Sequence, residues 1–195
     1  MYNYGVLKHK VFPLSQLPIE KVISSIISEL KSNQTLILKA PPGAGKSTYL
    51  PLQLILQNAI QGKIIMLEPR RLAAKSIAYY LAEQLGEKIG KRVGYRIRGE
   101  TNVGPNTKLE VVTEGILSRM IHADAELEGI GLVVFDEFHE RSLHADTALA
   151  FCLDIQEVLR DDLKLLVMSA TLDHAALKEL LPDARYIESQ GRSFP

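Results

Sequence analysis

Lys39-Ala40-Pro41-Pro42-Gly43-Ala44-Gly45-Lys46-Ser47-Thr48 is the stretch of sequence that decides the fold of this chain, and it is called here the phosphate loop. It follows the apolar run Thr35-Leu36-Ile37-Leu38 and precedes a helical pattern over positions 49–59. A strand, a glycine-rich loop and a helix in this order are the setting that a phosphate-binding loop requires. Taken alone, the loop also fits a glycine-rich turn with a solvated lysine.

The residue types of the phosphate loop suit the binding of a polyphosphate. Gly43 and Gly45 let the backbone turn sharply and expose consecutive N–H groups, which form an anion site at a helix N-terminus. Lys46 adds a positive charge at the β- and γ-phosphates, and the Ser47 hydroxyl can ligate Mg²⁺. Ala40 stands where the usual pattern has its first glycine, so we expect a negative φ there. The residues predicted to cradle the nucleotide are Pro42, Gly43, Ala44, Gly45, Lys46, Ser47 and Thr48.

Composition limits the classes of protein to which the chain can belong. With 195 residues, of which 46% are hydrophobic, it can bury one substantial core. Lys and Arg together number 23, as do Asp and Glu, so any nucleic-acid-binding surface must be a local basic patch. Cys152 is the only cysteine, which excludes a disulfide or a cysteine-based zinc site within one chain. We find no signal-peptide segment and no membrane-spanning run, and we expect a cytoplasmic protein without membrane association.

Short apolar strands alternate with helical patterns along the chain. This alternation is typical of βαβ units, and it predicts an α/β fold with a mostly parallel sheet flanked by helices on both faces. The predicted strands cover 35–38, 64–67, 93–98, 109–112, 132–135, 165–168 and 186–187. The predicted helices cover 19–30, 49–59, 72–85, 113–120, 143–159 and 177–181, and a loop is predicted at 102–106.

Four predicted strands end in polar clusters, at 43–47, 68–71, 136–139 and 169–171. In a doubly wound sheet the carboxyl ends of the strands share one crevice where ligands bind. Residues scattered over more than half of the sequence should therefore converge on one site.

The cluster after the fifth strand suits metal-assisted hydrolysis. Asp136 follows four apolar residues and can hold Mg²⁺ opposite Ser47. Glu137 beside it can orient and deprotonate an attacking water. The catalytic residues predicted from this pattern are Lys46, Asp136, Glu137 and His139. His139 can transmit the state of the γ-phosphate, with Ser169 and Thr171 as hydrogen-bonding partners of His139 or Asp136, although a structural role for these residues stays open.

Five motifs of the chain resemble those of the DEAH-box group of superfamily 2 helicases. Ala40-Pro41-Pro42-Gly43-Ala44-Gly45-Lys46-Ser47 looks like motif I, Pro69-Arg70-Arg71-Leu72-Ala73-Ala74 like motif Ia, and Thr113-Glu114-Gly115-Ile116-Leu117 like motif Ib. Asp136-Glu137-Phe138-His139-Glu140-Arg141 resembles motif II, and Ser169-Ala170-Thr171 resembles motif III. Phe138 departs from the alanine that names the group. Together with Leu67-Glu68-Pro69-Arg70-Arg71 and Gly191-Arg192-Ser193-Phe194-Pro195, it is similar to the bacterial HrpB-type helicases.

The resemblance implies the first RecA-like P-loop NTPase domain of an ATP-dependent RNA helicase, with ATP and Mg²⁺ as cofactors. It places an N-terminal lead-in and scaffold helix at 1–34, the ATP-binding domain at 35–190 and the start of a linker at 191–195. It also implies a second RecA-like domain in the full-length protein, which supplies arginine fingers. We expect ATP hydrolysis to drive movement along single-stranded RNA, with DNA as the alternative. Alone, this fragment should bind nucleotide and hydrolyse it poorly.

The resemblance also suggests which residues contact nucleic acid and the base. Residues of motifs Ia and Ib grip the nucleic-acid backbone in the family, which implicates Arg70 and Thr113, with Arg98 as a third candidate. Arg71 fits equally a helix cap or an ion pair with an acid. The family often has a base-stacking arginine where this chain has Tyr80, whose ring can stack in the same way.

The sequence also allows two rival functions. One is a non-catalytic nucleotide-binding module that docks a protein partner. The other is a P-loop kinase or GTPase-like switch, for which we find neither an acceptor site nor a guanine reader.

Overall fold

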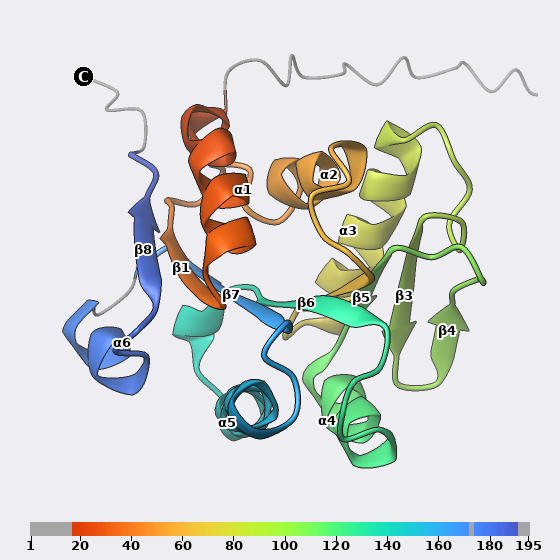
Figure 1. Ribbon diagram of the computed structural model, residues 1–195. Helices are drawn as coiled ribbons and strands as arrows, with labels where there is room; N and C mark the ends of the chain where they lie inside the picture. Colours follow the sequence, from red (N-terminus) through yellow and green to blue (C-terminus); the bar gives the residue numbers. More distant parts are fainter. Residues whose placement is uncertain (1–16, 172–173, 191–195) are drawn as a thin grey trace, which may run out of the picture.

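The computed structural model describes residues 17–171 and 174–190. Positions 1–16 of the predicted lead-in and scaffold helix at 1–34, and the predicted linker start at 191–195, lie outside the described residues. Within these ranges an eight-stranded sheet has the order β4-β3-β5-β2-β6-β7-β1-β8 (Figure 1). Its neighbouring strands are parallel, except for the antiparallel pair β3 and β4. The strands are β1 Thr35–Lys39, β2 Lys63–Leu67, β3 Val93–Ile97, β4 Glu100–Asn102, β5 Leu109–Val112, β6 Ile130–Phe135, β7 Lys164–Ser169 and β8 Arg185–Glu188. The predicted α/β fold with a mostly parallel sheet is confirmed.

Helices cover both faces of the sheet (Figure 1). One face carries α1 Ile23–Ser32, α2 Tyr49–Leu56 and α3 Arg71–Gln84, and the other carries α4 Glu114–Ala123, α5 Leu143–Val158 and α6 His174–Leu180. Each face has its own apolar core because successive strand residues point to opposite sides: Leu36 and Leu38 join the first core, and Ile37 joins the second. Burial on both faces explains the continuous apolar runs in the sequence. In the described part of the chain, no helix is long and apolar enough to cross a membrane.

The structure contains every predicted strand and helix, although several ends are shifted. The helix predicted at 19–30 begins as a 3-10 helix, η2 Pro18–Val22, and only then becomes α1. The edge strand β4 was not predicted, because its residues Glu-Thr-Asn are polar and carry no apolar alternation. A short 3-10 helix, η3 Phe138–Glu140, also has no counterpart in the prediction, and it lies inside the acidic cluster after β6.

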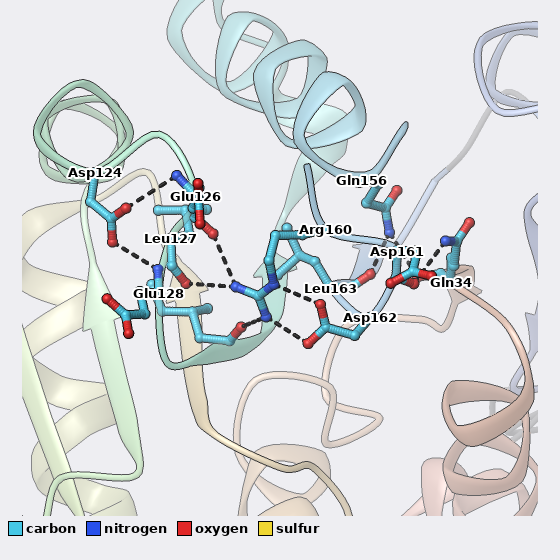
Figure 2. Close-up of polar contacts among 11 residues, drawn as sticks. Gln34, Asp124, Glu126, Leu127, Glu128, Gln156, Arg160, Asp161, Asp162 and Leu163 are labelled. Carbon is cyan, nitrogen blue, oxygen red and sulfur yellow. Dashed lines mark hydrogen bonds and ion pairs between the residues drawn. The ribbon is translucent and has the colours of Figure 1, made fainter. Parts of the chain in front are cut away.

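An arginine anchors the strand that leads to this acidic cluster. Arg160 follows α5 and donates hydrogen bonds to the carbonyl oxygens of Glu126, Leu127 and Ile130 at 2.9, 3.1 and 3.0 Å (Figure 2). It also pairs with both carboxylate oxygens of Asp162, at 2.6 and 2.7 Å. These contacts hold the end of α5 against the turn into β6, and so they fix where β6 begins.

Candidate functional site

The strand order brings the predicted site residues to one edge of the sheet. β1, β7 and β6 are consecutive neighbours of the sheet, and their carboxyl ends lead to the phosphate loop, Ser169 and Asp136. β2, β5 and β3 come next, and their carboxyl ends lead to Arg70, Thr113 and Arg98. The predicted nucleotide residues and the predicted nucleic-acid residues therefore occupy adjacent halves of one edge, which meet between β6 and β2.

The phosphate loop has the backbone that its sequence predicts. Gly43 and Gly45 have φ values of 73° and 97°, in the left-handed region that favours glycine. A Cβ on Gly45 would lie 2.9 Å from Leu17 Cδ1, so this position also needs glycine for space. Ala40 is not among the described residues with positive φ, as predicted, and its N–H donates to the carbonyl oxygen of Ser169 at 3.0 Å.

Lys46 is buried at the end of the loop. The residue is only 4% exposed, and its Nζ lies 3.7 Å from Oε1 of Glu137. A buried ammonium requires a negative partner, and in this structure Glu137 supplies it. A polyphosphate in the loop would offer Lys46 anionic oxygens in the same place.

Asp136 is a buried carboxyl with one unsatisfied oxygen. Its Oδ1 accepts the N–H of Glu137 at 2.9 Å, whereas its Oδ2 is buried without a hydrogen-bond partner. Burial raises the pKa of Asp136 to about 6, against the opposing effect of the neighbouring Ser47 hydroxyl. Such an oxygen beside a serine hydroxyl fits a cation. In the described ranges no three His, Cys, Asp or Glu side chains gather into a complete metal site, so Mg²⁺ would take its other ligands from water and phosphate oxygens.

Glu137 connects Lys46 with His139. Its Oε2 lies 3.3 Å from Nδ1 of His139, a short approach that does not meet hydrogen-bond geometry. The backbone of Glu137 has a φ of 50°, a left-handed conformation that is uncommon outside glycine and that often marks functional positions. Its side chain is 28% exposed, so water can reach the carboxylate.

The hydrogen bonds predicted from Ser169 and Thr171 to His139 or Asp136 are not formed. Ser169 is fully buried and its Oγ has no hydrogen-bond partner, while Thr171 is exposed. Ser169 is still part of β7, paired with Lys39 of β1, so the strand sets the direction of its side chain. In the structure, β7 contacts the phosphate loop through its backbone carbonyl instead.

The predicted nucleic-acid residues differ in exposure. The side chain of Arg70, at the N-cap of α3, is 69% exposed, and Arg98 is also exposed. Thr113, at the N-cap of α4, is only 8% exposed, so little of its hydroxyl faces solvent. Arg71 donates to the carbonyl oxygen of Arg98 at 2.8 Å, so its observed partner is a backbone group rather than the acid that the sequence allowed.

Tyr80 keeps an exposed ring on α3. It is 37% exposed. Its neighbour Tyr79 is 46% exposed, although the centroid of the Tyr79 ring lies 5.9 Å from that of Tyr95. Stacking of Tyr80 on a base stays a prediction.

Two acidic residues at this edge, Glu68 and Glu140, have no function predicted from the sequence. Glu68 is 4% exposed at the end of β2, and its Oε1 accepts the N–H of Arg70 at 3.3 Å. Burial, together with the nearby negative charge of Asp136, raises its pKa to about 7. Glu68 follows four apolar residues, as Asp136 does, so the same signal could have found it. Glu140 pairs with Arg70 across 70 positions of sequence, a contact that no local pattern reveals.

The chain is similar to known proteins over most of its length. The DEAD/DEAH box helicase family matches residues 20–180 of the chain. The chain is 59% identical over 182 residues to the ATP-dependent RNA helicase HrpB of Escherichia coli strain K12. These aligned residues make up 93% of this chain and 22% of that protein. A crystal structure of the E. coli DExH-box NTPase HrpB is similar with a TM-score of 0.87 and 60% identity, over 92% of this chain and 22% of that one.

More distant relatives share the same segment. The ATP-dependent RNA helicase HrpA of Borreliella burgdorferi is 36% identical over 92% of this chain and 22% of its own length. The probable ATP-dependent RNA helicase DHR2 of Saccharomyces cerevisiae is 33% identical over 91% of this chain and 25% of its own length. The chain thus spans a quarter or less of the length of these curated relatives.

Proposed function

This chain belongs to the DEAD/DEAH box helicase family, and we propose that it is the first RecA-like, ATP-binding domain of an ATP-dependent RNA helicase. We assign residues 35–190 to that domain, with α1 as a scaffold helix packed in its core. One observation carries the proposal: Lys46, Asp136 and Glu137 meet at one sheet edge, where a buried carboxylate oxygen has no hydrogen-bond partner.

Each residue at this sheet edge has a separate role in the proposed ATP hydrolysis. The backbone of the phosphate loop and the Lys46 ammonium bind the β- and γ-phosphates. Ser47 and Asp136 hold Mg²⁺, which when bound neutralises charge on the phosphates. Glu137 leaves Lys46 once phosphate oxygens replace it, and its carboxylate then orients the attacking water and accepts its proton.

The other half of the edge contacts the nucleic acid. Arg70 and Arg98 present exposed guanidinium groups at the ends of β2 and β3, and Thr113 presents the N-terminus of α4. Guanidinium groups and helix N-termini bind phosphates without reading bases, so the contact should be independent of sequence. The proposed ligand is single-stranded RNA.

The domain by itself should hydrolyse ATP slowly. Charge that develops on the γ-phosphoryl group needs cations besides Lys46, and an arginine supplied in trans raises the rate by about 10³–10⁵ in related enzymes. Two arginines near the site are already engaged: Arg70 pairs with Glu140, and Arg141 binds both oxygens of Asp146 at 2.9 Å. We propose that a second RecA-like domain supplies the missing cation and that closure of the two domains on RNA completes the site.

Isothermal titration with ADP and Mg²⁺ tests the nucleotide site. Lys46→Ala should raise the Kd for ADP by about 10- to 100-fold, because it removes a charge-assisted contact to phosphate. Lys31→Ala, an exposed lysine of α1, is the matched control and should leave the Kd unchanged. An unchanged Kd in a folded Lys46→Ala variant would refute the proposal.

A further inference from the structure

The two halves of the edge are joined by one ion pair. The guanidinium of Arg70, at the end of β2, contacts the carboxylate of Glu140, in η3 after β6. The Arg70 side chain is 69% exposed, so a phosphate from solvent can reach the guanidinium. Glu140 and a nucleic-acid phosphate would therefore compete for the same donor.

Glu140 is coupled through a short backbone segment to the residue that faces the nucleotide. It is the last residue of η3, and its N–H donates to the carbonyl oxygen of Glu137 at 2.9 Å. Glu137 and Arg141 flank η3 and have positive φ values of 50° and 36°. Such values are strained outside glycine, so backbone strain lies at both ends of the turn. Aromatic packing holds η3 in place: the ring of Phe138 packs edge-on against that of Phe135, with 6.1 Å between the ring centroids. Moving one end of so short a turn must disturb the other.

The ends of this turn contact two different ligand sites. At one end the Glu137 carboxylate lies 3.7 Å from Lys46 Nζ, and at the other the Glu140 carboxylate pairs with Arg70. A polyphosphate would displace Glu137 from Lys46, and a nucleic-acid phosphate would displace Glu140 from Arg70. Each ligand would therefore replace one side-chain contact at one end of this turn.

We propose that Glu140 is a positioning residue that restrains Arg70 until nucleic acid binds, and that the Arg70–Glu140 pair couples the nucleic-acid half of the edge to Glu137. The inference rests on the proposed function, because it assumes that Arg70 binds nucleic-acid phosphate. Release of Arg70 frees η3, which lets Glu137 leave Lys46 and turn to the attacking water. Occupancy of either site then favours occupancy of the other, as linkage requires.

Binding of fluorescein-labelled oligouridine, measured by anisotropy at several salt concentrations without nucleotide, tests the restraint. Glu140→Gln keeps the size of the side chain and removes its charge. It should tighten binding by about two- to fivefold, the range expected for loss of one competing exposed ion pair. It should also steepen the salt dependence by up to about 0.7, because one more phosphate contact forms on a single strand.

The control and the double variant separate this effect from a general change in charge. Asp146→Asn removes one negative charge and one ion pair close to the same turn, but its partner is Arg141 rather than Arg70, and it should not reproduce the gain. In an Arg70→Ala background, Glu140→Gln should give no gain at all. Equal gains from Asp146→Asn, or a gain that persists without Arg70, overturn the restraint. If Arg70→Ala alone leaves binding unchanged, the nucleic-acid role of Arg70 fails, and the inference fails with it.

A second measurement tests the coupling to the nucleotide. The Kd for ADP with Mg²⁺ is determined with and without saturating oligouridine, for the wild type and for Glu140→Gln. We expect oligouridine to lower the Kd in the wild type and to have a smaller effect in the variant. An absent effect in the wild type, or an equal effect in the variant, overturns the coupling. A simple structural role for Glu140 would change stability and leave this ratio intact.

Discussion

The charge on Glu68 should destabilise the free domain at alkaline pH. Glu68 is 4% exposed, and the negative charges of Asp136, Glu137 and Glu140 raise its pKa, whereas the hydrogen bond from the N–H of Arg70 lowers it. Burial and these charges raise its pKa from 4.5 to about 7, so the folded state holds the proton more tightly than the unfolded chain does. The stability that this protonation contributes is therefore complete below about pH 4.5 and is lost as the pH rises through about 7.

Glu68→Gln prevents the loss of stability at alkaline pH, because the amide carries no charge. It keeps the hydrogen bond, because the amide oxygen can still accept the N–H of Arg70. One pKa unit corresponds to about 1.4 kcal/mol, so a rise in pKa from 4.5 to about 7 should make the variant about 3 kcal/mol more stable than the wild type towards unfolding above pH 8. The difference should fall below about 1 kcal/mol near pH 5, with the same sign throughout.

Urea unfolding followed by circular dichroism, with EDTA and without nucleotide, measures the difference at both pH values. Glu128→Gln, an exposed carboxylate, serves as the control and should change the unfolding free energy little at either pH. If Glu68→Gln is no more stable than the wild type at about pH 8, or if the gap is equal at both pH values, the burial argument is wrong.

Four further predictions concern hydrolysis, nucleic-acid binding, stability and the turnover of this chain by itself. Glu137→Gln in a protein that carries both RecA-like domains should slow phosphate release by about 10²–10⁴-fold and lower the Kd for ADP by no more than a few-fold; hydrolysis within a few-fold of wild type would assign the base elsewhere. Arg98→Ala should weaken oligouridine binding and reduce its salt slope by about 0.7, equally for other sequences, and a change in sequence preference would mean that Arg98 reads bases. Arg160→Ala should lower the unfolding free energy by about 2 to 3 kcal/mol in urea, because three backbone carbonyls lose a charged donor; a loss as small as that of an exposed arginine would contradict the anchoring role. Steady-state phosphate release by this 195-residue chain should be slow with or without RNA, and RNA-stimulated turnover would falsify the need for a second domain.

Local sequence alone predicted the elements and the nucleotide half of the site. The phosphate loop needs glycine where φ is positive, at Gly43 and Gly45, and a lysine directly after Gly45. These residues are neighbours in the sequence, so a local pattern is enough to identify the loop. Apolar runs that end in Asp136 or Ser169 likewise predict strands whose ends meet, because parallel strands share one carboxyl edge. Periodicity and turn chemistry act over a few residues, which is why the predicted strands and helices are confirmed. Nucleotide binding by the loop residues, Asp136 and Glu137 stays a prediction.

The tertiary structure decided what depends on distant neighbours. β4 is a strand only because β3 offers it backbone partners, since its own residues are polar. The Ser169 hydroxyl is directed by β7 and does not reach His139. Arg70 and Glu140 meet across 70 positions because β2 and β6 are neighbours in the sheet. A side chain's partner is set by strand order and by the direction in which a strand presents it, and neither quantity is encoded in the residues beside it.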